Sequence, residues 1–94
     1  MTARACVYIL ASKPRGTLYT GATSNLPLRM EQHRSRAVPG FTAKYGVTRL
    51  VWFETYADIR DAISREKALK KWYRAWKIEL IEKSNPVWNE LHPW

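Results

Sequence analysis

The feature that most constrains the fold is a short, wholly apolar run near the start of the sequence, at residues 5–11. It reads Ala-Cys-Val-Tyr-Ile-Leu-Ala and ends at a Ser-Lys-Pro-Arg-Gly segment. Such a run is typical of a buried strand that leads into a turn. Residues 17–20 (Thr-Leu-Tyr-Thr) follow, rich in β-branched and aromatic side chains, and close at Gly21. The two runs are therefore predicted to pair as an antiparallel hairpin.

The middle of the chain is predicted from caps, breakers and composition. Thr-Ser-Asn at 23–25 supplies N-cap candidates for a helix, and Pro27 suits its first turn. This helix should run to about Arg36, because Pro39-Gly40 stops it. Residues 47–56 have the composition of a third strand.

The second half of the chain is predicted to be mainly helical. A stretch rich in Ala, Arg, Lys and Glu begins near Asp58 and should reach at least Tyr73. A bend near residues 74–75 and another helix to Lys83 fit the sequence. The order β-β-α-β-α-α predicts an α/β (α+β) fold, a small three-stranded antiparallel sheet flanked by helices. A length of 94 residues allows one such domain, over residues 1–94.

The charge of the chain narrows the kind of partner. Sixteen Lys and Arg residues against 8 Asp and Glu give a formal charge of +8, which favours nucleic acid first and an anionic membrane second. No apolar run approaches the ~20 residues that span a bilayer, and no signal peptide is predicted. The single cysteine, Cys6, cannot form an internal disulfide, so we expect a reducing cytoplasm and a buried, inert thiol.

Ionisable residues lie on the apolar stripes of both main helices. In the first, Leu26, Met30 and Ala37 recur at helical spacing and should face the sheet, and Arg29 and His33 share their stripe. The stripe of the second contains Glu66 and five apolar or aromatic residues: Ile59, Ala62, Ile63, Leu69 and Tyr73. A carboxylate in such a place must be paired, protonated or bound to a metal, because burying it bare is costly.

Each of these residues also has a purely structural interpretation. Arg29 and Glu66 would satisfy each other as a buried ion pair between helices, and His33 would be a hydrogen-bonded histidine at the edge of the core. Tyr8 and Tyr19 are individually uninformative, because tyrosine is common in strands. Only their combination points to a functional site.

The combination resembles the GIY-YIG nuclease family over nearly the whole chain. The first family motif corresponds to Cys6-Val7-Tyr8 and the second to Tyr19-Thr20-Gly21. Arg29 and Glu66 fall at the arginine and glutamate of the family, and the closing motif corresponds to residues 85–89, which end at Asn89. The resemblance is greatest to the short stand-alone bacterial subgroup of the YhbQ-like (UPF0213) type. Ala22 stands where some relatives carry a lysine.

The resemblance implies a metal-dependent endonuclease that hydrolyses phosphodiester bonds in DNA, in repair or processing. Glu66 would bind one Mg²⁺ or Mn²⁺, and Arg29 would grip the scissile phosphate. Tyr8 is favoured as the general base, with His33 accepting its proton and Tyr19 positioning the water or the phosphate; which tyrosine is the base stays open.

Other residues are assigned supporting roles. Gly21 would let the backbone approach, and Asn89 would order Glu66 or the sheet edge. Phe41 and Tyr45 would stack on bases or pack under their loop. The five tryptophans are assigned mainly to core and helix contacts. Basic residues are expected to follow the nucleic-acid backbone, or else to form a solvated helix face: Arg34, Arg36, Lys44, Arg65, Lys67, Lys70, Lys71, Arg74 and Lys77.

Two rival functions are compatible with the same residues. One is a nucleic-acid-binding module with little catalysis, and the other is a catalytic subunit that needs a protein partner. We expect a monomer that binds DNA, with RNA as the alternative substrate, and no membrane partner.

Overall fold

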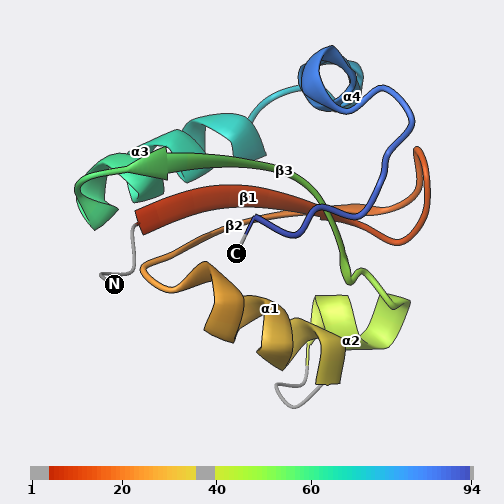
Figure 1. Cartoon of the computed structure of the whole chain (residues 1–94). Helices are drawn as coiled ribbons and strands as arrows, with labels where there is room; N and C mark the ends of the chain where they lie inside the picture. Colours follow the sequence, from red (N-terminus) through yellow and green to blue (C-terminus); the bar gives the residue numbers. More distant parts are fainter. Residues whose placement is uncertain (1–4, 36–39, 94) are drawn as a thin grey trace.

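The computed structural model describes residues 5–35 and 40–93, apart from the side chain of Phe41. Three strands and four helices follow in the order β1 (Ala5–Ala11), β2 (Leu18–Thr23), α1 (Leu26–Ser35), α2 (Phe41–Tyr45), β3 (Arg49–Tyr56), α3 (Ile59–Lys70) and α4 (Arg74–Ser84). The strands form one antiparallel sheet in the order β2-β1-β3. Helices α1 and α2 lie on one face of the sheet and α3 and α4 on the other (Figure 1). The predicted fold class and the β1–β2 hairpin are confirmed.

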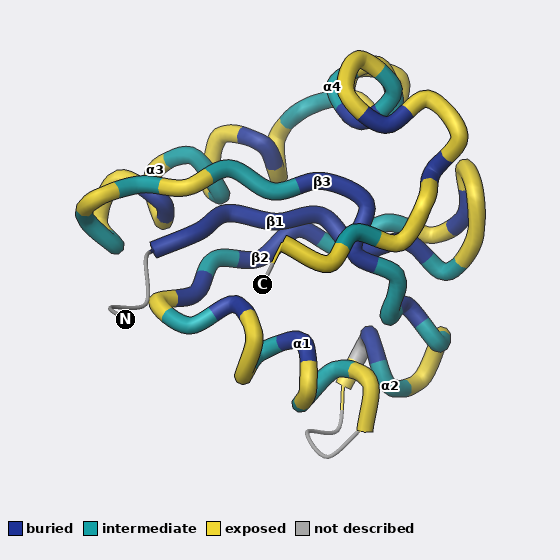
Figure 2. The backbone as a smooth tube through the Cα atoms, in the orientation of Figure 1, coloured by how far each residue is buried: buried dark blue, intermediate teal, exposed yellow. Residues whose placement is uncertain are grey.

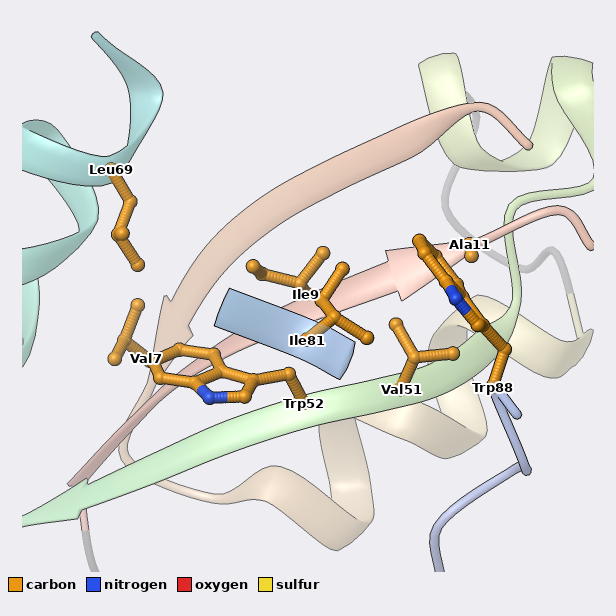
Figure 3. Close-up of a cluster of buried hydrophobic side chains, with 8 residues drawn as sticks. All are labelled: Val7, Ile9, Ala11, Val51, Trp52, Leu69, Ile81 and Trp88. Atoms are coloured by element: carbon orange, nitrogen blue, oxygen red, sulfur yellow. The ribbon is translucent and has the colours of Figure 1, made fainter. Parts of the chain in front are cut away.

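The central strand β1 is buried along its whole length, as Figure 2 shows. Because side chains alternate across a strand, its residues are divided between two clusters. Val7, Ile9 and Ala11 pack on the α3–α4 face with Ile81, Leu69 and residues of β3 and the tail (Figure 3). Cys6, Tyr8 and Leu10 pack on the α1 face with Leu26 and Met30. A phenol is thus held inside an otherwise apolar layer.

The caps that start the main helices agree with the prediction. The Asn25 Oδ1 accepts a hydrogen bond from the Leu28 amide at 3.2 Å, so Asn25 is the cap among the three candidates before α1. The Asp58 Oδ1 accepts the Arg60 amide at 2.8 Å at the start of α3. Leu26 and Met30 are buried as predicted, whereas Arg36, Ala37, Pro39 and Trp94 lie outside the described residues.

Several predicted boundaries were wrong. Strand β2 continues through Gly21 to Thr23, and β3 begins at Arg49 rather than at residue 47. The short helix α2 was not predicted; its five residues end at Tyr45, and the C-cap Gly46 that follows adopts a left-handed conformation with φ of 64°.

The long second helix is divided earlier than predicted. The amides of Lys71 and Trp72 bond to the carbonyls of Ala68 and Leu69, which closes the last turn of α3, and Tyr73 is extended before α4 begins. Tyr73 and Ile63 are 70% and 37% exposed, so their assignment to the inner face was wrong. Ala62 and Leu69 carry the packing of α3 on the sheet.

The tip of the β1–β2 hairpin docks on α4. Arg15 forms two 2.8 Å hydrogen bonds to the Glu82 carboxylate, and the Arg74 guanidinium donates to the Gly16 carbonyl at 2.7 Å. These contacts fix α4 beside the sheet. None of the helices in the described part of the chain is long and apolar enough to cross a membrane.

The tail after α4 is tied to β3 by Asn85. Its buried amide donates to the carbonyls of Val51 (3.0 Å) and Asn89 (2.9 Å), and its side-chain oxygen accepts the Asn89 amide at 3.0 Å. The ordering role predicted for Asn89 therefore belongs to Asn85, because Asn89 contributes backbone groups and is exposed. Beyond it, the Leu91 amide donates to the Leu50 carbonyl, so the tail covers the β3 edge.

Replacing Asn85 with alanine should lower the free energy of unfolding by about 2–4 kcal/mol, because it removes three hydrogen bonds and leaves the Val51 carbonyl unpaired. Urea denaturation monitored by circular dichroism measures the change. Asn89→Ala is the matched control and should change stability by no more than about 0.5 kcal/mol. Equal losses in the two variants would contradict the assignment.

Candidate active site

Three aromatic rings meet on the α1 face of the sheet. The ring centroids of Tyr8 and Tyr19 are 6.4 Å apart, and those of Tyr8 and Tyr19 lie 5.9 and 5.7 Å from the centroid of His33. The strand register explains the tyrosine pair: Tyr19 lies opposite Leu10 and Gly21 opposite Tyr8, so both tyrosines point to one face. The structure thus joins three of the predicted catalytic residues.

Gly21 makes room for the Tyr8 hydroxyl. A Cβ atom at this position would lie 2.5 Å from the Tyr8 Oη and 2.6 Å from its Cζ. These separations are too short for any side chain, so only glycine leaves the phenol where it is. Gly21 was predicted as a nucleic-acid-binding residue, but the space it leaves is filled by Tyr8.

His33 is held at both ring nitrogens. Its Nε2 is 3.0 Å from the Tyr8 Oη, and its Nδ1 is 3.0 Å from the Thr42 Oγ1. Burial, and secondly the charge of Arg29, lower the pKa of His33 below its ordinary value, so the ring is neutral near pH 7. Thr42 was not predicted as a site residue, because its contact depends on α2.

The ionisation of Tyr8 is opposed by its surroundings. Burial raises the pKa of Tyr8 far above its ordinary value, and Tyr19 and Glu66 raise it further, while the charge of Arg29 and a hydrogen bond from it act in the opposite direction. The phenol is therefore protonated and donates to the His33 Nε2. The ring then carries its own proton on Nδ1 and donates it to the Thr42 hydroxyl oxygen.

Arg29 and Glu66 approach the rings from opposite faces of the sheet. Arg29 is half-buried on α1, one turn before His33. Glu66 lies on α3, which packs against β1 and the edge strand β2, and both charges act on Tyr8. Within residues 5–35 and 40–93, no ion pair joins Arg29 to Glu66; the Glu66 carboxylate instead lies 3.4 Å from the Lys70 Nζ. The structural alternative of a buried Arg29–Glu66 pair is not observed.

The acidic groups at the site suit a particular type of metal binding. The described residues contain no group of three or more His, Cys, Asp or Glu side chains that could enclose an ion. The Glu66 side chain is 18% exposed, and in the described part of the chain it forms an i,i+4 ion pair with the exposed Lys70. Such pairs are weak. One accessible carboxylate fits a hard cation such as Mg²⁺, which takes its other ligands from water and substrate phosphate.

The predicted basic residues differ in their surroundings. Arg65 is 3.3 Å from Glu54 and lies 5.2 Å from the centre of the Trp72 ring, and Arg74 bonds to the hairpin, so both have structural roles. Arg34 lies 3.5 Å from Glu90, and Lys44 lies over Tyr45. Three exposed lysines follow Glu66 along α3: Lys67, Lys70 and Lys71. Arg36 lies outside the described residues.

Comparison with known proteins defines the class of this protein. The sequence matches the GIY-YIG catalytic domain over residues 4–79, most of the chain. The chain therefore belongs to the GIY-YIG family, a nuclease family whose members generally depend on divalent metals. The match indicates endonuclease activity in general and binding of a DNA substrate.

The similar proteins point to a narrower group within this family. The UPF0213 protein CPE1444 of Clostridium perfringens is 41% identical over 75 residues, which cover 80% of each chain. A UPF0213 protein of Syntrophus aciditrophicus is 39% identical over 84 residues, 85% of this chain and 91% of that protein. The solution NMR structure of the UPF0213 protein BH0048 from Bacillus halodurans has a TM-score of 0.57 and 26% identity, and the alignment covers 93% of this chain and 92% of that one. The predicted UPF0213-type resemblance is confirmed.

The geometry predicts how His33 titrates. Arg29→Gln should raise the pKa of His33, because it removes the guanidinium charge that lowers it, while burial still keeps the pKa below about 6.5. An NMR titration of the imidazole protons measures the shift. Arg34→Gln, an exposed arginine on the same helix, is the control and should leave the titration unchanged.

The same shift has a consequence for stability. The pKa of His33 is lower in the folded chain than in the unfolded chain. The neutral ring therefore contributes its full stabilisation at pH values above the unfolded pKa of about 6.5. This contribution is lost as the pH falls through the folded pKa. A His33 pKa above 6.5 in the wild type would contradict the buried, Tyr8-bonded arrangement.

Proposed function

We propose that this protein is a metal-dependent endonuclease that hydrolyses phosphodiester bonds in DNA. The observation that carries the proposal is the convergence of Tyr8, Tyr19 and His33 at one site, with the charges of Arg29 and Glu66 both acting on Tyr8. Among the residues that the structure describes, Arg29 and Glu66 form no ion pair with each other, so a structural ion pair does not explain why both charges lie near the rings. Phosphodiester hydrolysis needs a proton acceptor for the attacking water and neutralisation of the charge on the phosphate, and these groups can supply both.

Arg29 would bind the scissile phosphate. Its planar guanidinium offers parallel donors to two phosphate oxygens, and it is half-buried beside the rings. Glu66 would hold a single Mg²⁺ or Mn²⁺ from the α3 side, replacing its contact with Lys70. When bound, the ion supplies neutralisation of the charge that develops on the phosphate and on the leaving oxygen.

The proton of the attacking water would leave through Tyr8 and His33. As the Tyr8 oxygen accepts this proton, the phenol passes its own proton to the His33 Nε2, 3.0 Å away. The transfer needs no free phenolate, which the raised pKa of Tyr8 would make scarce at neutral pH. Tyr8 is fully buried, so the water would enter past the half-buried Tyr19, which would position it.

Exposed lysines would hold the DNA on either side of the site. Lys67, Lys70 and Lys71 continue from Glu66 along α3, and Arg34 and Lys44 lie on the α1–α2 side. Contacts of this kind release counterions from DNA, so binding would weaken steeply with salt.

Glu66→Gln and Arg29→Ala should each reduce nicking of DNA with Mg²⁺ or Mn²⁺ by at least about 100-fold, because each removes a group that acts on the transition state. Affinity for DNA should change by no more than about threefold, since the other basic residues remain. Cleavage and binding of labelled duplex, single-stranded and branched DNA, and of RNA, measure the two effects separately. Glu79→Gln removes an exposed carboxylate on α4 and is the control. A wild-type protein that binds these substrates and cuts none of them would contradict the endonuclease and favour a nucleic-acid-binding module.

Removal of single hydroxyl groups tests which tyrosine takes the proton. Tyr8→Phe keeps the ring but breaks the link to His33, and should lower kcat by about 10²–10⁴ with little effect on DNA affinity. Tyr19→Phe should cost less, because positioning of the water survives in part. Single-turnover cleavage rates provide the comparison. The reverse order of effects would assign the role of base to Tyr19.

A further inference from the structure

An aromatic cluster is exposed where α3 passes into α4. The Trp76 ring centroid lies 4.8 Å from that of Tyr73 and 6.1 Å from that of Trp72, with edge-to-face angles of 82° and 83°. Trp72 packs against the core, whereas Tyr73 and Trp76 are 70% and 51% exposed. We call Tyr73 and Trp76 the junction aromatics.

The fold does not use the outer surface of the junction aromatics. Helix α4 packs on the sheet through the fully buried Ile81, with Ile78 and Leu80 partly buried beside it. Two large neighbouring rings exposed to water are unusual in a small domain, and exposed apolar patches of this kind commonly mark interaction sites. Trp76 was predicted to make mainly core and helix contacts; it contacts the Trp72 and Tyr73 rings, but half of the residue is exposed and it is not part of the core.

The surroundings of the junction aromatics are cationic. Lys70 and Lys71 precede them, and Arg74 and Lys77 alternate with them along the chain. Lys77 is half-buried, and its pKa is lowered by burial and then by the charges of Lys70 and Arg74, so these cations lie close to one another. The first turn of α4 contains no acidic residue. The cations around the junction aromatics therefore complement a polyanion rather than a protein surface of mixed charge.

The cationic surface is continuous with the candidate active site. Lys70 is 3.4 Å from Glu66 at one end and acts on Lys77 at the other. A strand whose scissile phosphate is bound by Arg29 and by the ion at Glu66 would thus follow the lysines to the junction aromatics. Aromatic rings beside such a track are how proteins bind single strands, because a ring can stack on any base that is not already paired.

We propose that Tyr73 and Trp76 stack on unpaired bases next to the scissile phosphate, which makes the preferred substrate a nucleic acid with a single-stranded segment. The inference rests on the proposed function for the position of the scissile phosphate. Duplex DNA presents no free base faces here, so the junction aromatics would contribute little to its binding.

The test compares variants that differ only in the ring at position 76. Trp76→Leu keeps an apolar side chain without a stacking face, and Trp76→Phe keeps a smaller ring. Binding of a labelled oligothymidine and of a blunt duplex is measured by fluorescence anisotropy with EDTA present, so that no cleavage occurs. Trp76→Leu should lose about tenfold in affinity for the single strand and less than about twofold for the duplex. Trp76→Phe should recover most of the loss, and Tyr73→Leu should behave as Trp76→Leu.

Three results would overturn the proposal. The first is equal affinity of Trp76→Leu and wild type for the single strand, and the second is an equal loss for single strand and duplex. The third is loss of binding to anionic phosphatidylglycerol vesicles with no loss for the oligonucleotide, which would make the patch a membrane-surface site. Circular dichroism confirms that each variant is folded. Cleavage assays are separate, so a protein that stacks single strands but never cuts would refute only the proposed function.

Discussion

The burial of one phenol explains most of what is unusual in this structure. Tyr8 lies on the strand that both layers of helices cover, and a buried hydroxyl without a partner would cost about 1–3 kcal/mol. His33 supplies the partner, and Thr42 in turn holds the other nitrogen of His33. Gly21 leaves the space in which the hydroxyl lies. Two strands and two helices are therefore positioned around a single polar atom.

The two edges of the sheet have different neighbours. The tail covers the β3 edge through Asn85 and the Leu91–Leu50 hydrogen bond, so this side is closed by backbone contacts. On the β2 side, α3 packs on β1 and β2, and the His33 ring of α1 lies against the Tyr19 ring of β2 from the other face, so Arg29 and Glu66 both act on the Tyr8 phenol. Since a small sheet has few positions where both helix layers reach one point, the candidate site residues gather around Tyr8 of the central strand and Tyr19 of the edge strand.

The sequence predicted the elements well where apolar residues form a run or a helical stripe, and poorly where a helix ends or a side chain bonds to a distant residue. The buried strand at residues 5–11 was correct, because a short continuous apolar run that ends at a turn indicates it, and the stripe of Leu26 and Met30 was correct because of its helical spacing. Tyr73 was placed on the inner face because the second helix was expected to reach it, but α3 ends at Lys70 and Tyr73 is extended before α4. Ile63 lies within α3, whose buried residues are Ala62 and Leu69, and is itself 37% exposed. Asn85 bonds to Val51, which is far away in the sequence, and Thr42 bonds to His33 from the helix α2, which was not predicted. No local pattern encodes such pairs.

The charges at the site also suggest how substrate binding would be linked to proton transfer in the proposed function. In the free protein, the cation of Arg29 lowers the pKa of His33, which makes the ring a weaker proton acceptor. A phosphate bound to Arg29 would neutralise this field, and the pKa of His33 would rise toward its ordinary value. His33 would thus become the better acceptor for the Tyr8 proton when a phosphate is in place. In the proposed function, Arg29 would bind the phosphate and His33 would receive the proton; the two residues are one turn apart on α1, and this spacing would couple the two events.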